Sequence, residues 1–265
     1  MVITGASSGI GKETAFAFAR KQAHVIIAAR NTDKLNEVAK ACLDYGAASC
    51  LAVPCDVTSA SSCEKLMQTV IQQYKTIDVL INNAGISMRA LFNQADIKVI
   101  EQVMQVNFWG AVYCTRYAID TLLKSKGVVI SVSSIAGIRG LPGRTGYSAS
   151  KFALEGFMQS LRTENKKTGL HVGVIYPGYT ESNIRNTALN ASGNAQQESP
   201  FDESKLMPAS TVAECILNMA TNRIQQQVLT TQGKLTFWLS KFVPSFVDNM
   251  IYKVVSKEKD SPFTS

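Results

Sequence analysis

The sequence predicts an α/β protein in which helices cover both faces of a parallel sheet. Along the 265 residues, short apolar stretches alternate with longer segments whose apolar residues have helical spacing. The apolar stretches show little alternation with polar residues, which is typical of strands buried on both faces. Strands and helices that follow one another in this way form βαβ units, so the sheet is expected to be doubly wound.

The first strand is expected at residues 2–4, directly before a glycine-rich loop. Further strands are predicted at 24–29, 49–53, 79–81, 128–132, 172–176 and 227–230. Helices are predicted at 10–21, 33–45, 61–74, 97–125, 148–166 and 211–221, and the fourth is long enough for two helices. The first strand is short for a central strand of about 5–6 residues. We therefore expect that the natural chain begins upstream of Met1 or that this strand starts late.

Two regions do not follow the alternation of strands and helices. Residues 180–207 are polar and long for a connection, which is typical of a lid or binding loop. Residues 233–265 form a C-terminal extension of the predicted domain of residues 1–232. Charged residues and a proline interrupt its apolar run, so we expect one or two amphipathic helices. No run reaches the roughly 18 apolar residues of a membrane span, and no signal peptide is evident at the N-terminus.

Composition limits the classes of partner. The net charge is +7, but the basic residues are dispersed, which favours a solvated surface over nucleic-acid binding. A positive field also suits a phosphorylated cofactor or an anionic membrane. His24 and His171 lack partners at metal-ligand spacing, so no metal site is predicted. Six scattered cysteines without a C-x-x-C pair indicate free thiols in a reducing compartment, and hence a cytoplasmic protein.

Tyr147 and Lys151 are four residues apart, a spacing that places both on one face of a helix. A phenol has a pKa of about 10, and a neighbouring ammonium group favours the phenolate, so Lys151 is predicted to lower the pKa of Tyr147. The hydroxyl of Ser134, upstream, could hold a carbonyl or alcohol oxygen. Such a pair alone is commonly a solvated helix surface, but the three residues together predict proton transfer to or from that oxygen.

The loop after the first strand has the spacing G-x-x-x-G-x-G, with glycines at Gly5, Gly9 and Gly11. Glycine lets the backbone approach a phosphate, and a helix N-terminus offers free N–H groups, so the loop predicts a pyrophosphate site rather than an ordinary turn. NAD sites usually carry an acid about 20 residues further on. Here Ala29 and Arg30 end the second strand. A guanidinium suits a 2′-phosphate, which predicts NADP(H), unless Arg30 is only a surface residue.

Further motifs follow in a specific order. They are Cys55-Asp56-Val57, Asn82-Asn83-Ala84-Gly85, Asn107, Ser133-Ser134-Ile135-Ala136-Gly137 and Pro177-Gly178. From Thr4 to about Thr230 the chain resembles the classical short-chain dehydrogenase/reductase family, in particular its NADP(H)-preferring steroid and lipid-ketone branch. The resemblance implies a single-domain Rossmann fold with a seven-stranded parallel sheet in the order 3-2-1-4-5-6-7, flanked by helices.

The resemblance also implies roles for the catalytic residues. Tyr147 would be the acid/base. Lys151 would lower its pKa and hold the nicotinamide ribose. Ser134 would orient the substrate oxygen, with Ser133 secondary, and Asn107 would position a water for proton relay.

The same resemblance implies the cofactor contacts. The residues implied are Gly5, Ser7, Ser8, Gly9, Ile10, Gly11, Arg30, Asn31, Asp56, Val57, Asn83, Ala84, Gly85, Tyr147, Lys151, Pro177, Gly178, Thr180 and Ser182. Asp56, Asn83 and Ala84 would contact the adenine and its ribose, and Pro177 and Gly178 the nicotinamide. Many family members have a threonine four residues after this glycine. Ser182 stands there, so either its hydroxyl or that of Thr180 could serve.

The expected activity is hydride transfer between NADPH and an apolar ketone or aldehyde. Residues 180–207 would form the substrate lid, and the pocket would include Met88, Arg89, Leu91 and Phe92. A homodimer or homotetramer is implied, paired through the helices at 97–125 and 148–166. The tail could pack on the protein or touch a membrane. Two alternatives stay open: an NADP(H)-binding sensor or scaffold without turnover, and a membrane-surface structural protein.

Overall fold

The computed structural model describes residues 1–196, 206–257 and 261–263. Its sheet is parallel throughout, in the order β3-β2-β1-β4-β5-β6-β7, and the predicted fold is confirmed. The strands are β1 Val2–Thr4, β2 His24–Ala29, β3 Ser49–Pro54, β4 Val79–Asn82, β5 Val128–Val132, β6 His171–Tyr176 and β7 Gln226–Val228. The order reverses between β1 and β4, and ligands of such sheets bind beside the reversal, at the carboxyl ends of the strands.

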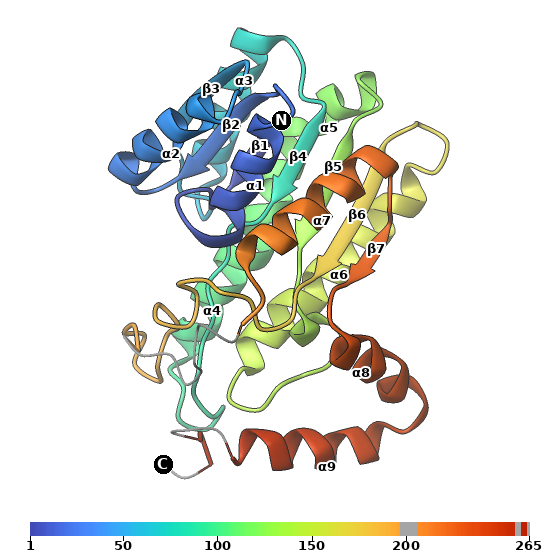
Figure 1. The fold of residues 1–265 in the computed structure, drawn as a ribbon. Helices are drawn as coiled ribbons and strands as arrows, with labels where there is room; N and C mark the ends of the chain where they lie inside the picture. Colours follow the sequence, from blue (N-terminus) through green and yellow to red (C-terminus); the bar gives the residue numbers. More distant parts are fainter. Residues whose placement is uncertain (197–205, 258–260, 264–265) are drawn as a thin grey trace.

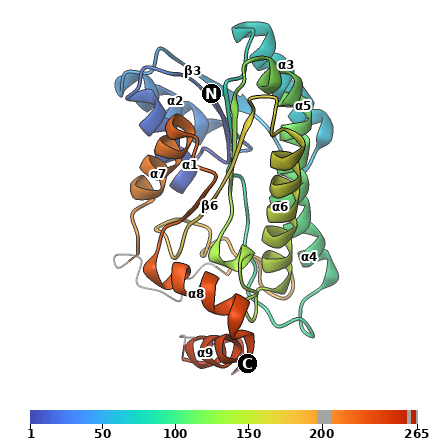
Figure 2. The ribbon, with the colours of Figure 1, turned by 90° about the vertical axis from the view of Figure 1, so that its right-hand side faces the viewer.

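Helices cover both faces of the sheet (Figure 1). Seen nearly edge-on in Figure 2, α1, α2 and α7 lie on one side and α3, α5 and α6 on the other. Their bounds are α1 Gly9–Ala19, α2 Thr32–Asp44, α3 Ala60–Tyr74, α5 Gly110–Lys124, α6 Thr145–Glu164 and α7 Ala209–Asn222. Helix α6 begins three residues earlier than predicted, so Tyr147 lies within its first turn.

Alternate strand residues pack into two cores, one on each face of the sheet. Leu80 contributes to the core under α3, α5 and α6, and the next residue, Ile81, contributes to the core under α1, α2 and α7. Both side chains are fully buried. Since successive residues of a strand point to opposite faces, an all-apolar strand supplies both cores.

The helix predicted at 97–125 is interrupted. Helix α4 covers Ile97–Met104, a π-helical turn follows at Gln105–Trp109, and α5 begins at Gly110. Such turns are rare and often occur at functional sites. The turn carries Asn107, whose buried side chain makes hydrogen bonds described below.

The C-terminal extension forms two helices, α8 Thr231–Phe242 and α9 Pro244–Val255. Pro244 is the first residue of α9, where its missing N–H breaks no helical hydrogen bond. Both helices lie below the carboxyl ends of the strands (Figure 1). Within the described residues, no helix combines the length and hydropathy that crossing a bilayer requires.

The six cysteines are free thiols, as predicted. Four are buried, whereas Cys50 and Cys215 are half-buried. The thiol of Cys114 donates to that of Cys63 over 3.6 Å, and this pair packs between α3 and α5.

Candidate active site and cofactor site

The glycine-rich loop leaves the end of β1 and enters α1. Gly5 and Gly9 have φ angles of +67° and +52°, a region that strongly favours glycine. A Cβ on Gly11 would lie 2.3 Å from the carbonyl oxygen of Gly5, so this position has no room for a side chain. Within the described chain, the N-cap residue Ser8 makes no side-chain capping bond, and the first N–H groups of α1 are left available to a phosphate.

Thr4 and Asn83 tie this loop to the neighbouring strand end. The hydroxyl oxygen of Thr4 accepts hydrogen bonds from the N–H groups of Asn83 and Ala84, each at 3.1 Å. The side-chain amide of Asn83 donates to the carbonyl oxygens of Thr4 at 2.9 Å and Gly5 at 3.1 Å. The amide of Asn83 therefore shapes the loop from within, besides lining the cavity next to it.

A cavity of about 900 Å³ lies between this loop and the carboxyl ends of the strands. Every residue predicted to bind the cofactor lines it except Gly11, which packs behind the loop against the carbonyl of Gly5. Ser182 lies close to the loop, because a Cβ on Gly9 would meet the Cβ of Ser182 at 3.2 Å. The buried Thr180 donates its hydroxyl to the carbonyl of Gly178.

The end of this cavity between β2 and α2 contains a cation that the sequence analysis did not identify. Lys34 lines the cavity beside Arg30 and Asn31. Asn31 is the N-cap of α2, and its side-chain oxygen accepts from the N–H of Lys34 at 2.9 Å. The available signal was the closeness of the two basic residues in the sequence: Arg30 directly precedes the N-cap Asn31 and Lys34 lies in the first turn of α2. Two basic side chains and a helix N-terminus suit a phosphate.

Tyr147 and Lys151 lie on one face of α6, and the Lys151 Nζ is 5.8 Å from the centre of the Tyr147 ring. The ammonium group donates to the carbonyl oxygen of Val132 at the end of β5, at 2.8 Å. Burial lowers the pKa of Lys151 to about 8.

The pKa of Tyr147 departs from our prediction. Burial raises it above the usual value, and this effect outweighs the hydrogen bond from Ser134 and the positive charges of Arg144 and Arg185, which lower it. The charge of Lys151 by itself predicts a lowered pKa. That prediction is wrong, because desolvation of the phenolate dominates.

Asn107 links the π-helical turn to the catalytic helix. Its Oδ1 accepts from the N–H of Ile86 at 2.8 Å, and its Nδ2 donates to the carbonyl of Ile86 and to the hydroxyl of Ser150, both at 2.9 Å. A Cβ on Gly85 would lie 3.2 Å from Asn107 Oδ1 and 3.6 Å from Lys151 Nζ. Asn107 does not line the cofactor cavity, but its side chain lies near the ammonium group.

A second cavity of about 460 Å³ adjoins the first. Ser134 and Tyr147 line both cavities and so stand at their boundary. Met88 and Arg89 line the second cavity as predicted, whereas Leu91 and Phe92 are not among its described lining residues, and Phe92 points to solvent, 66% exposed. The sequence analysis missed the contribution of α9, which supplies an apolar wall.

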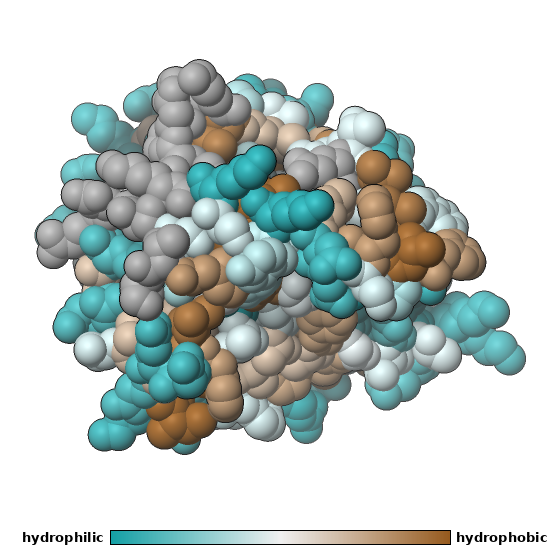
Figure 3. Space-filling view, turned by 90° about the horizontal axis from the view of Figure 1, so that it is seen from below, coloured by the Kyte–Doolittle hydropathy of each residue, from teal (hydrophilic) through white to brown (hydrophobic). Residues whose placement is uncertain are grey.

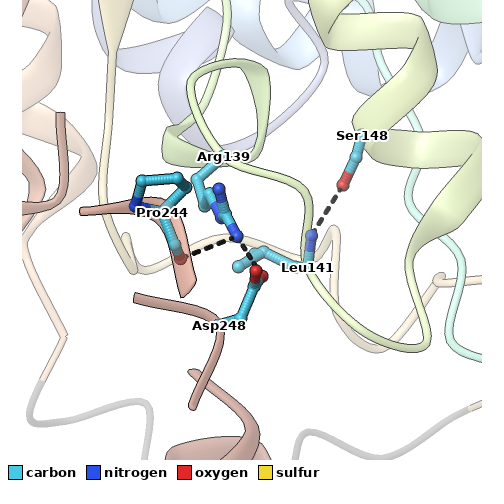
Figure 4. Close-up of polar contacts among 5 residues, drawn as sticks. All are labelled: Arg139, Leu141, Ser148, Pro244 and Asp248. Atoms are coloured by element: carbon cyan, nitrogen blue, oxygen red, sulfur yellow. Dashed lines mark hydrogen bonds and ion pairs between the residues drawn. The ribbon is translucent and has the colours of Figure 1, made fainter. Parts of the chain in front are cut away.

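The segment between Ser134 and Tyr147 is held on two sides (Figure 4). The guanidinium of Arg139 pairs with Asp248 of α9, and it donates to the carbonyl of Pro244 at 3.5 Å. The N–H of Leu141 donates to the hydroxyl of Ser148 on α6 at 3.2 Å. These contacts connect the catalytic segment to the helix that closes the second cavity.

The geometry agrees with comparisons to known proteins. A family model described as short chain dehydrogenase matches residues 1–192. The chain is 32% identical over 252 residues to 11-beta-hydroxysteroid dehydrogenase-like 4A of Arabidopsis thaliana, covering 93% of this chain and 81% of that protein. It is 34% identical over 250 residues to dehydrogenase/reductase SDR family protein 7-like of Drosophila melanogaster, covering 92% and 77% respectively.

A solved structure has the same fold. It is an alcohol dehydrogenase from the archaeon Thermococcus sibiricus complexed with 5-hydroxy-NADP, with a TM-score of 0.76 and 23% identity, covering 86% of this chain and 94% of that one. The fold and the ordered motifs define a nucleotide-dependent oxidoreductase. The chain belongs to the classical short-chain dehydrogenase/reductase family.

The buried ammonium of Lys151 gives a prediction about stability and pH. Its folded-state pKa of about 8 lies below the ordinary 10.5, so burial of the charge destabilises the fold fully below pH 8, and the penalty is relieved as pH rises from about 8 to 10.5. Lys151→Met removes this buried charge and also the hydrogen bond to the carbonyl of Val132. With both effects included, the substitution should stabilise the cofactor-free protein by about 2 kcal/mol at pH 7.

Thermal unfolding at pH 7 and pH 10 measures this difference, with the exposed Lys40→Met as the matched control. The advantage of Lys151→Met should shrink at pH 10, whereas Lys40→Met should match the wild type at both values. Equal stability of Lys151→Met and wild type at pH 7 would contradict the argument.

Proposed function

We propose that the protein is an NADP(H)-dependent oxidoreductase that interconverts an apolar ketone or aldehyde and its alcohol. The observation that carries this proposal is the position of Tyr147 and Ser134, which line both the cofactor cavity and the adjoining cavity. A substrate in the second cavity would have its oxygen within reach of both hydroxyls while its carbon faced the first. The bound dinucleotide would supply or accept the hydride.

In this proposal the four catalytic side chains have separate tasks. Tyr147 gives a proton to the carbonyl oxygen during reduction, and burial keeps the phenol in the protonated form that this step needs. Ser134 holds the same oxygen. Lys151 binds the nicotinamide ribose and stabilises the phenolate that remains, and Asn107 orients a water beside Lys151 for reprotonation.

Cofactor preference rests on the end of β2. Ala29 stands where an NAD site usually has an acidic residue that binds the ribose 2′-hydroxyl. Arg30 and Lys34 place two positive charges at the edge of the cavity. These features favour a 2′-phosphate. The glycine loop, the uncapped N-terminus of α1 and the Thr4–Asn83 hydrogen bonds would hold the pyrophosphate.

The apolar wall of the second cavity supports an apolar substrate. Met250, Ile251 and Val254 of α9 line it, together with residues of α8. The described part of the 180–207 segment also lines it, in keeping with a lid, whereas residues 197–205 lie outside the described residues. Helix α8 begins at Thr231, so the predicted boundary at residue 232 falls within its first turn, and in this proposal the C-terminal helices are an extension of the same domain that completes its substrate cavity.

The alternative, a cofactor-binding sensor without turnover, has weaker support. Such a protein would not need a second cavity that reaches both Ser134 and Tyr147. It would also have no need for the costly burial of the Lys151 ammonium group.

Replacing the phenol hydroxyl tests the reaction. Tyr147→Phe should reduce turnover of a carbonyl substrate by about 10²–10⁴-fold while NADPH still binds, because general acid catalysis is lost. Absorbance of NADPH follows turnover, and protein fluorescence follows binding. The exposed Tyr45→Phe serves as the control. Near-normal rates in Tyr147→Phe would exclude the proposed mechanism, and the sensor alternative predicts no turnover in the wild type.

Replacing the two cations tests cofactor choice. Arg30→Gln combined with Lys34→Gln should weaken NADPH binding by about tenfold or more and leave NADH binding nearly unchanged, because only NADPH carries the 2′-phosphate. Fluorescence titration of both nucleotides measures the ratio of their dissociation constants. Lys21→Gln, exposed and outside the cavity, is the matched control. A wild-type preference for NADH would show that the assignment of Arg30 is wrong.

We also propose peripheral membrane contact through the C-terminal helices. Leu235, Trp238 and Phe242 share one exposed face of α8, and Phe246 continues it on α9. In the space-filling view, hydrophobic residues gather where α8 and α9 meet (Figure 3). Lys241 lies over the rings of Phe237 and Trp238, and Lys253 of α9 is also exposed, a combination typical of helices at an anionic lipid surface.

Liposome flotation tests this contact. The wild type should float with vesicles that contain anionic lipid, whereas Phe242→Ser combined with Phe246→Ser should shift most of the protein to the soluble fraction, because two large apolar side chains are lost. Phe92→Ser, which removes an equally exposed phenylalanine elsewhere, should still float. Packing of this face against another protein predicts no flotation of any variant.

The proposed assembly is a homodimer or homotetramer. Trp109 and Phe152 are 42% and 46% exposed, on the adjoining π-helical turn and α6. Trp109 also stacks on Tyr113 of α5. Aromatic residues are enriched in protein–protein interfaces. Trp109 and Phe152 also lie in the helical regions, 97–125 and 148–166, through which subunit pairing was expected.

A further inference from the structure

The second cavity has two chemically different sides. One is the apolar wall formed by Met250, Ile251 and Val254 of α9. The other contains three arginines from segments far apart in the sequence: Arg89 after β4, Arg144 at the start of α6 and Arg185 after β6. Among the described residues that line the cavity, none is an aspartate or a glutamate.

Arg144 is the most informative of the three. It is half-buried and lines the second cavity but not the cofactor cavity, so a nucleotide phosphate does not account for it. No described residue accepts a hydrogen bond from its side chain or pairs with it. Guanidinium groups bind carboxylates and related oxyanions through paired hydrogen bonds, and a partly desolvated cation is stabilised by such a ligand.

Arg185 approaches the same place from the segment after β6. Its Nη2 donates to the carbonyl oxygens of Thr180 at 2.7 Å and Ser182 at 3.4 Å, which fixes the side chain between the two cavities. The charges of Arg144 and Arg185 both act on Tyr147, lowering its pKa against the larger opposing effect of burial. Both guanidinium groups therefore lie within electrostatic reach of the reacting hydroxyl.

We propose that the substrate is an amphipathic oxyanion, an oxo or hydroxy compound whose carboxylate or sulfate group binds at Arg144 while its apolar body lies against α9. This inference rests on the proposed function, because it names the substrate class of the same cavity. It keeps the apolar body of the proposed carbonyl substrate and adds a negatively charged group to it. The competing interpretation is that Arg144 and Arg185 serve only to lower the pKa of Tyr147 and bind no anionic group of the substrate.

Binding to the NADPH-loaded protein distinguishes these interpretations without requiring turnover. Calorimetric titration should give decanoate and decyl sulfate at least about tenfold tighter binding than decanamide, the uncharged analogue. Arg144→Gln should remove this difference. Arg144→Lys, which keeps the charge without the planar fork, should retain part of it. Arg20→Gln removes one positive charge from the surface, so it should behave as the wild type.

Turnover gives an independent measurement with 9-oxodecanoate and its methyl ester. The acid should have the higher kcat/KM in the wild type. Arg144→Gln should raise the KM of the acid without raising that of the ester, whereas the accompanying change in the pKa of Tyr147 would alter kcat for both substrates. If decanamide binds as tightly as both anions, or if Arg144→Gln lowers kcat/KM by the same factor for acid and ester, the oxyanion site is refuted. Failure of the reductase proposal would appear separately, as absence of turnover for every carbonyl compound while decanoate still binds through Arg144.

Discussion

The rest of the site depends on the hydrogen bonds that join the ends of β1 and β4. The Thr4 hydroxyl and the Asn83 amide hold these two strand ends together at the point where the strand order reverses. The glycine loop then leaves β1 with its carbonyl groups already engaged, and α1 begins with its N–H groups directed at the cavity. Because Gly11 packs against Gly5, the loop is fixed by backbone contacts on one side and by the Asn83 amide on the other.

The catalytic group illustrates a balance between charge and burial. Lys151 keeps an ammonium group inside the protein, where desolvation lowers its pKa to about 8. The same burial raises the pKa of Tyr147. The carbonyl of Val132 accepts a hydrogen bond from the Lys151 ammonium group and so replaces part of the water that this group loses.

The C-terminal helices connect the chemistry to the surroundings of the protein. Helix α9 supplies the apolar wall of the second cavity with one face, and Arg139 joins it to the segment between Ser134 and Tyr147. The exposed aromatic residues of α8 and α9 lie on the outside of the same unit. The same pair of helices therefore lines the second cavity and carries several large apolar side chains that face solvent, among them Trp238, Phe242 and Phe246.

The sequence by itself determined the parallel α/β fold, the glycine loop and the spacing of Tyr147 and Lys151. These features depend on local periodicity and on residues close together in the chain. It also indicated most of the residues that line the first cavity, because several of its motifs follow the end of a strand and parallel strands end at one edge of the sheet. Only the tertiary structure decided the direction of the Tyr147 pKa shift, the place of Lys34 beside the cofactor cavity, and the meeting of Arg89, Arg144 and Arg185 with α9. Desolvation and long-range contacts depend on which groups surround a side chain in space. The spacing of residues along the sequence reports only its local neighbours.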